Sequence, residues 1–281
     1  MNLIQAILMG IVQGLSEFLP ISSSAHLVFT SNFYKVMQNI PMVQSSSEEV
    51  FFDIMVHLGT LIAVLIFFRK DVLNILKAMW HAIKTKDWSD KEAKLGLYIV
   101  VGTILTIILA LPINEVAEKL VFRPDIVGGL LFITGFALLY SEYKSKKLEE
   151  KKDNVDLKTS VFIGLAQGLA ALPGFSRSGW TIATGLFMGL DRVTAARYSF
   201  LLSIPIILGA SMVYPLVKID VHEALTYNWT AIWAGTIVSG IVGYLCIKYF
   251  MKFISKFSLA IFGYYCILAG LGAVAFFSYY G

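Results

Sequence analysis

Six long apolar segments constrain this sequence more than any other feature. A helix needs about 20 mostly apolar residues to cross a bilayer core about 30 Å thick. Six segments approach or reach that length: 51–68, 95–113, 126–141, 198–217, 229–247 and 257–278. Charged residues make up only 15% of the chain, whereas soluble globular domains carry about 25%. The sequence therefore predicts an all-α integral membrane protein, with residues 1–281 forming a single membrane domain.

Two further apolar segments, 3–15 and 159–172, are too short to cross a bilayer. Each one runs into a proline, Pro20 or Pro173, and then into a serine-rich stretch and another short apolar run. Short, broken segments at membrane depth are typical of re-entrant helix–loop–helix hairpins. We therefore expect two such hairpins, each followed by three transmembrane helices.

The two expected hairpins resemble each other in sequence. Both contain Gly-x-x-Gln-Gly-Leu, starting at Gly10 and Gly164, and both continue with Leu-Pro and Ser-x-Ser, with a one-residue offset of the Leu-Pro. Unless this match is due to chance, it indicates two repeated halves, at 1–141 and 159–281. Because three crossings separate the hairpins, an odd number, the second half is inverted. The sequence thus predicts an inverted-topology repeat whose broken loops meet near the midplane.

Basic residues are distributed unevenly among the loops. Residues 69–94 contain seven Lys or Arg, and residues 142–158 contain six Lys. Since cytoplasmic loops are enriched in basic residues, both are predicted to be cytoplasmic, with 142–158 as a charged linker between the halves. The first hairpin then opens to the outer face of the cell membrane. No basic stripe interleaved with aromatic residues is present, so no nucleic-acid partner is expected.

The first hairpin contains two ionisable residues, Glu17 and His26. Such groups inside membrane segments are usually functional or paired. Gln13 lies four residues before Glu17 and shares its helix face if the helix persists. Pro20 tends to break that helix, and the serines after it can cap the next one, whose free N–H groups attract phosphate. These serines are Ser22, Ser23 and Ser24.

The second hairpin supplies donors for an anion. Arg177 offers a planar fork that matches phosphate oxygens, and Gly174 permits close backbone approach. Further hydroxyls come from Ser176, Ser178 and Thr181. Together the hairpins hold an arginine, a carboxylate, an imidazole and several hydroxyls, which is an inventory suited to phosphoryl chemistry.

These motifs resemble the two signatures of the undecaprenyl pyrophosphate phosphatase family. Gln13-x-x-x-Glu17, followed by Phe-Leu-Pro-x-Ser-Ser and His26, is similar to the first signature. The second is matched by Pro173-Gly-x-Ser-Arg-Ser-x-x-Thr181. Residues 53–60 and 190–205 are also similar to the family, and the likeness extends nearly end to end.

The resemblance implies hydrolysis of undecaprenyl diphosphate to undecaprenyl phosphate and inorganic phosphate, which recycles the lipid carrier of cell-wall synthesis. It also implies bacitracin tolerance, an outward-facing site in a multi-pass protein and a divalent cation, Mg or Ca. By position it carries functional roles to Glu17, Ser23, His26, Ser176 and Arg177. The first acidic position of the signature is Gln13 here, and an amide is the weaker metal ligand, so Glu17 is the expected one. A homodimer is compatible with this reading.

Several roles stay open at this point. Arg177 is expected to clamp phosphate, or alternatively to form a structural ion pair with Glu17. Glu17 is a metal ligand or a base that orients His26, and His26 is a general acid–base or the nucleophile. Ser23 is either the nucleophile or a phosphate hydrogen-bond donor, and direct attack by water is a third route.

Two alternatives belong to other classes of protein. A transporter or flippase could use the same loops to bind a polyprenyl phosphate lipid without cleaving it, since inverted repeats are a transporter architecture. Another membrane lipid-phosphatase family uses a histidine soon after a Ser-Arg pair, but here none follows Arg177 until His222. In the span at 51–68, Asp53 and His57 lie at i and i+4 and can pair with each other, with a catalytic role as the alternative.

Overall fold

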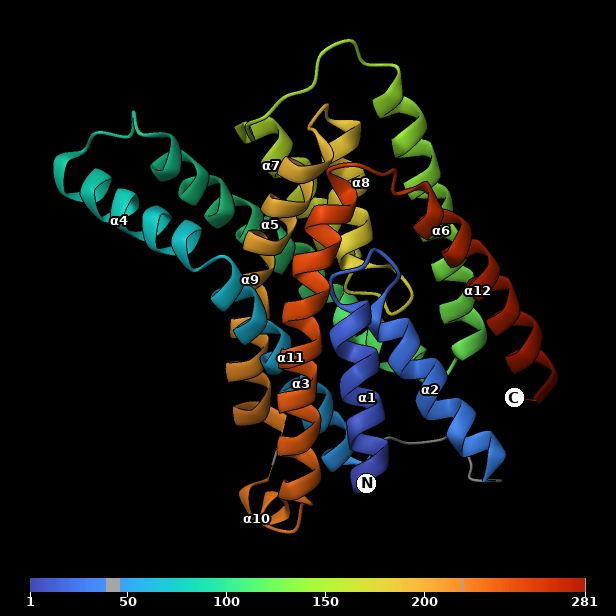
Figure 1. The fold of residues 1–281 in the computed structure, drawn as a ribbon. Helices are drawn as coiled ribbons and strands as arrows, with labels where there is room; N and C mark the ends of the chain where they lie inside the picture. The colour runs from blue at the N-terminus through green and yellow to red at the C-terminus, as the bar shows by residue number, and fades with distance from the viewer. Residues whose placement is uncertain (39–45, 219, 281) are drawn as a thin grey trace.

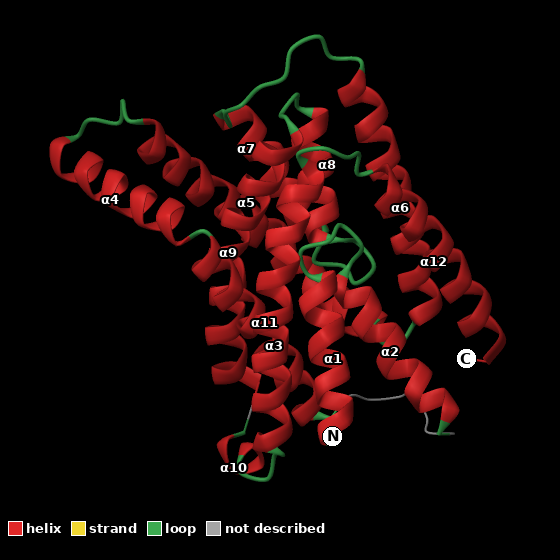
Figure 2. Cartoon of the chain, viewed as in Figure 1, coloured by secondary structure: helices red, strands yellow, loops and turns green. Residues whose placement is uncertain are grey.

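The computed structural model describes residues 1–38, 46–218 and 220–280. Within these ranges the chain forms twelve helices and no β-strand (Figures 1 and 2). In chain order they are α1 (Leu3–Ser16), α2 (Ser23–Met37), α3 (Ser47–Phe67), α4 (Arg69–Thr85), α5 (Lys91–Leu120), α6 (Pro124–Lys146), α7 (Leu157–Leu169), α8 (Arg177–Phe187), α9 (Arg192–Lys218), α10 (Val221–Ala224), α11 (Trp229–Ile254) and α12 (Ala260–Tyr280).

Six of these helices are long and apolar enough to cross a membrane: α3, α5, α6, α9, α11 and α12. They coincide with the six predicted spans, so the prediction of an all-α multi-pass membrane protein is confirmed. The shortest predicted span, 126–141, is extended at both ends, because α6 runs for 23 residues.

The two short apolar segments form helix–loop–helix hairpins, α1–α2 and α7–α8. Helix α1 has 14 residues and α7 has 13, which are too few to cross a bilayer core. Their loops lie side by side in the middle of the molecule (Figure 1), where the Ser178 hydroxyl donates a 3.0 Å hydrogen bond to the Leu19 carbonyl. The inverted orientation of the two halves stays a prediction.

Small residues let each hairpin pack closely against a long helix of the other half. A Cβ added at Gly10 of α1 would lie 2.5 Å from the carbonyl oxygen of Gly235 in α11. A Cβ added at Gly164 of α7 would lie 2.6 Å from the carbonyl oxygen of Gly102 in α5. Small residues at helix interfaces are a main source of tight packing in membranes. These contacts hold α1 against α11 and α7 against α5.

The linker predicted at 142–158 is shorter in the structure, because α6 continues to Lys146. Glu142, inside this range, is buried and accepts two hydrogen bonds of 2.7 Å from Arg192 and one of 2.9 Å from the Leu259 amide. Glu142 thus joins α6 to α9 and to the start of α12. Nearer α7, the Lys152 ammonium lies 2.8 Å from Asp156 and lowers the pKa of that carboxyl to about 2.

Candidate active site

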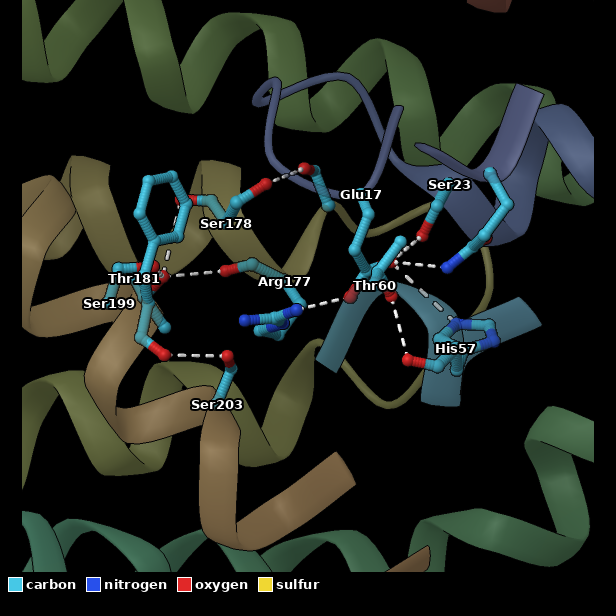
Figure 3. Close-up of polar contacts among 12 residues, drawn as sticks. Glu17, Ser23, His57, Thr60, Arg177, Ser178, Thr181, Ser199 and Ser203 are labelled. Carbon is cyan, nitrogen blue, oxygen red and sulfur yellow. Dashed lines mark hydrogen bonds and ion pairs between the residues drawn. The ribbon is translucent and has the colours of Figure 1, made fainter. Parts of the chain in front are cut away.

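The hairpin loops bring Glu17 and Arg177 into contact. Arg177 Nη2 donates to Glu17 Oε1 in an ion pair that joins the two halves of the chain (Figure 3). Glu17 is 5% exposed. A buried carboxylate is costly unless it is paired and hydrogen-bonded, so this guanidinium is what allows Glu17 to stay charged there.

Glu17 is the centre of a wider hydrogen-bond network. It caps the C-terminus of α1, and its Oε2 accepts hydrogen bonds from Ser23 Oγ at 2.6 Å and from Gln13 Nε2 at 3.0 Å. The Gln13 contact has the i, i+4 geometry expected from the sequence. A third neighbour is His57 of α3, whose Nε2 lies 3.7 Å from the same Oε2. Both oxygens of Glu17 are therefore occupied by donors.

Ser22 and Ser176 are N-caps of the second helix of each hairpin. The Ser22 hydroxyl accepts from the Ala25 amide at 3.2 Å, and the Ser176 hydroxyl accepts from the Gly179 amide at 3.0 Å. Each cap also lies within hydrogen-bond distance of the hydroxyl two residues on, 3.2 Å for Ser24 and 3.3 Å for Ser178. The cap serines are thus engaged locally.

The remaining hydroxyls of the second hairpin hold its loop in place. Besides the Ser178 bond to Leu19, Thr181 Oγ1 donates to the Arg177 carbonyl at 2.8 Å and lies 2.6 Å from Ser199 Oγ of α9 (Figure 3). Gly174 has a φ of 101°, in the left-handed region that glycine favours. The hydroxyls of Ser178 and Thr181 are thus used to position the loop that carries Arg177, and not to bind a ligand.

A cavity of about 420 Å³ lies beside the ion pair. Its polar lining residues are Glu17, Ser23, Ser24, Asp53, His57, Arg177 and Ser211. Its apolar wall includes Ile54, Ala170, Phe175, Ile206, Ile207 and Ala210. The other predicted site residues do not line it: Gln13, Ser22, His26, Gly174, Ser176, Ser178 and Thr181. The cavity therefore offers a charged end and an apolar end to one ligand.

Arg177 keeps one nitrogen free for that ligand. Its Nη2 is bound to Glu17, whereas its buried Nη1 has no hydrogen-bond partner in the described part of the chain. An unsatisfied buried donor of this kind is costly and calls for an explanation. Because this nitrogen is itself buried, a phosphate can reach it only if the Arg177 side chain or its neighbours move.

His26 lies away from this network. Its Nδ1 is 2.8 Å from the Ser22 carbonyl, and its Nε2 is 2.7 Å from the Tyr265 hydroxyl of α12, with the two rings stacked. Both ring nitrogens are thus occupied by groups other than Glu17 or Arg177. Its predicted acid–base or nucleophilic role stays a prediction.

His57 takes the position beside Glu17 that the sequence suggested for His26. Its Nδ1 lies 2.7 Å from the backbone carbonyl of Asp53, so these two residues pair through the backbone and not through the carboxylate. The signal that points to His57 is an ionisable residue inside a transmembrane segment. Which neighbour it faces depends on how α3 is rotated, and sequence periodicity alone does not give that rotation.

The expected role of Glu17 as a metal ligand does not fit this arrangement. Three donors already occupy its oxygens, and the Arg177 guanidinium would repel a cation placed beside it. Residues 1–38, 46–218 and 220–280 contain no group of three or more His, Cys, Asp or Glu side chains that could hold a metal.

Comparisons with known proteins agree over nearly the whole chain. The bacitracin resistance protein BacA family matches residues 6–272. An undecaprenyl-diphosphatase of Methanobrevibacter smithii is 42% identical over 280 residues, covering 96% of each chain. An undecaprenyl-diphosphatase of Korarchaeum cryptofilum is 39% identical, and undecaprenyl-diphosphatase 1 of Pseudoalteromonas translucida is 36% identical; each covers 98% of this chain and 99% of the relative. The chain therefore belongs to the bacitracin resistance protein BacA family.

Proposed function

We propose that this protein hydrolyses a polyprenyl diphosphate, undecaprenyl diphosphate, to the lipid monophosphate and inorganic phosphate. The observation that carries the proposal is the buried ion pair of Glu17 and Arg177 at a cavity that charged and apolar side chains line together. Family membership and the names of the relatives support the same reaction.

Arg177 binds the terminal phosphate in this mechanism. Its planar guanidinium can hold a phosphate through two donors, and its charge stabilises the negative charge that develops on the transferring group. Phosphoryl transfer depends almost entirely on such positioning and electrostatic stabilisation. The attacking oxygen belongs to Ser23 or to water. Glu17 orients two groups at once, because its Oε2 accepts from the Ser23 hydroxyl and its Oε1 accepts from the Arg177 guanidinium.

The apolar wall of the cavity suits the prenyl chain. Ile206, Ile207 and Ala210 lie on α9, one of the six long apolar helices, so a chain leaving the cavity along them stays in an apolar environment. A lipid with a diphosphate head and a prenyl tail therefore matches both walls at once.

The uneven distribution of basic residues supports a cell-membrane protein with its site opening outward. In that position the enzyme would regenerate the monophosphate carrier lipid for cell-wall synthesis. The two short hairpins, with the same pattern of residues, support an inverted-topology repeat. Assembly as a homodimer stays a prediction.

A divalent cation, Mg or Ca, is proposed to arrive on the diphosphate itself. Magnesium is commonly held by substrate phosphates with few protein ligands, and when bound it would neutralise phosphate charge. We expect a chelator to lower phosphate release at least tenfold and added Mg or Ca to restore it. Full activity in excess chelator would exclude this requirement.

The rival function is transport of a polyprenyl phosphate without cleavage. Purified protein in vesicles should be given undecaprenyl diphosphate, with release of inorganic phosphate and translocation of the lipid measured separately. Hydrolysis predicts phosphate release with wild-type protein. Translocation without phosphate release would favour the transporter.

A further inference from the structure

His57 is held in one orientation by its own helix. Its Nδ1 lies 2.7 Å from the Asp53 carbonyl, and since a carbonyl can only accept, Nδ1 carries the proton of that bond. In the neutral ring Nε2 is then the acceptor. This nitrogen has no hydrogen-bond partner within the described ranges, and His57 lines the 420 Å³ cavity together with Ser23 and Arg177.

The other candidates for a proton acceptor are less open. Glu17 already accepts from Arg177, Ser23 and Gln13. His26 has both ring nitrogens occupied, by Ser22 and by Tyr265. Only His57, of these three residues, offers a free lone pair beside the phosphate-binding arginine.

Glu17 is well placed to stabilise a charge on the His57 ring. The distance from Nε2 to Glu17 Oε2 is 3.7 Å, and the Ser23 hydroxyl lies 2.6 Å from the same oxygen. A proton taken up at Nε2 would create a positive ring next to a carboxylate. A backbone carbonyl at one nitrogen and a carboxylate near the other is a suitable environment for a general base.

We propose that His57 is the general base of the hydrolysis, which is an extension of the proposed function. The attacking water oxygen forms a new bond to the terminal phosphorus while one of its protons moves to His57 Nε2. The bond from that phosphorus to the bridging oxygen breaks, and its electron pair leaves with the lipid monophosphate. Arg177 stabilises the charge on the transferring group.

The proton has a polar region through which to leave. His57 and Asp53 also line a second cavity of about 120 Å³, whose wall includes Ser24, Ser31 and Lys35. The two cavities therefore share His57 as a wall residue. Water in the second cavity would accept the proton and return the ring to its neutral form.

Three substitutions separate a base from a hydrogen-bonding or packing residue. His57→Asn places an amide near the position of Nδ1, His57→Gln places one near Nε2, and His57→Ala leaves space. We expect each to lower kcat for phosphate release from undecaprenyl diphosphate about 100-fold, within the range for general bases, with KM changed less than about threefold. His81→Ala, at an exposed position of α4, is the matched control and should retain wild-type rates.

Chemical rescue gives a second measurement. Added imidazole should raise the rate of His57→Ala at least tenfold, whereas pyrazole, a ring of similar size but a much weaker base, should not. Near-wild-type kcat in the glutamine variant, or equal rescue by both compounds, would overturn the assignment. If the alanine variant does not fold, the asparagine and glutamine variants still decide the matter through kcat. Absence of hydrolysis by wild-type protein would instead refute the proposed function.

Discussion

The two hairpins make the same helix-cap contacts, although φ is 70° at Ser22 and −72° at Ser176, and they supply opposite charges to the site. In each one a serine caps the second helix and lies near the hydroxyl two residues on, Ser22 with Ser24 and Ser176 with Ser178. The residue between them is Ser23 in the first hairpin and Arg177 in the second, and both bind Glu17, one at each oxygen. The shared scaffold places a side chain at the first helical position, and the identity of that side chain decides its chemistry.

The same comparison extends to the neighbouring positions. When the repeats are aligned with Gly164 matched to Gly10, the counterpart of Glu17 is Ala171. The second hairpin therefore lacks the carboxylate. Trp180 is the counterpart of His26 in the same spacing, and its ring nitrogen donates to a hydroxyl, Thr134 of α6, at 3.1 Å. Neither hairpin is therefore sufficient for the site, which needs Glu17 from one and Arg177 from the other.

The largest expected effect comes from removing the charge of the second hairpin. Arg177→Ala should lower phosphate release by about 10³-fold or more, because the transferring phosphate loses its main electrostatic partner. Membrane insertion and expression should be unchanged. The exposed Arg123, which pairs with its near neighbour Asp125, provides the control, and Arg123→Ala should keep wild-type turnover. Near-normal turnover by Arg177→Ala would contradict the phosphate-binding role.

Removing the charge of the first hairpin should have the next largest effect. Glu17→Gln keeps the shape of the side chain but no longer balances the guanidinium or holds the Ser23 hydroxyl as firmly. We expect a loss of about 100-fold in kcat, near the lower end of what one preorganised polar group contributes. Steady-state kinetics would measure it, and a change smaller than twofold would show that the carboxylate charge is dispensable.

The loop glycine of the second hairpin gives a sharper test of how Arg177 is positioned. A Cβ at Gly174 would lie 2.5 Å from the Val127 carbonyl, and φ is 101°. Gly174→Ala should therefore lower both thermal stability and activity, the latter at least tenfold. Gly189, with φ of 95° but no atom nearer than 3.9 Å to an added Cβ, is the matched control. Gly189→Ala should lower stability by about 1 kcal/mol and leave turnover within twofold.

The smallest effects are expected at the helix caps. Ser22→Ala and Ser176→Ala each remove one acceptor for a helix N-terminal amide, which costs about 1 kcal/mol. Thermal unfolding in detergent should show similar, modest losses for the two variants. A loss at only one cap would show that the hairpins are not equivalent at this level.

Much of the architecture follows from the sequence. Apolar length predicts the six spans, and the prolines at 20 and 173 predict where the short helices break. The contact of Glu17 with Arg177 follows from the repeat, because two like hairpins at membrane depth have to bury their charges against each other.

The neighbours of each side chain are harder to predict. Whether His26 or His57 faces Glu17 depends on the rotation of α2 and α3 about their axes. That rotation is set by packing of α3 against α11 and α9 and of α2 against α1 and α6, together with contacts such as the one between Tyr265 of α12 and His26. The local engagement of Ser178 and Thr181 was likewise missed, because hydroxyl spacing is compatible with a ligand or with the loop itself.

The bond between Glu17 and Arg177 has a consequence for how the enzyme discriminates between its substrate and its product. Before any lipid enters, the carboxylate acts as an internal substitute for phosphate and competes for the guanidinium. The diphosphate head carries more negative charge in total than the monoester product, whose single phosphate is attached directly to the apolar chain, and so it competes with the carboxylate more strongly. Opening the resting ion pair costs the same free energy for either lipid, and the more highly charged diphosphate regains more of it; re-formation of the pair favours release of the spent lipid after each turnover.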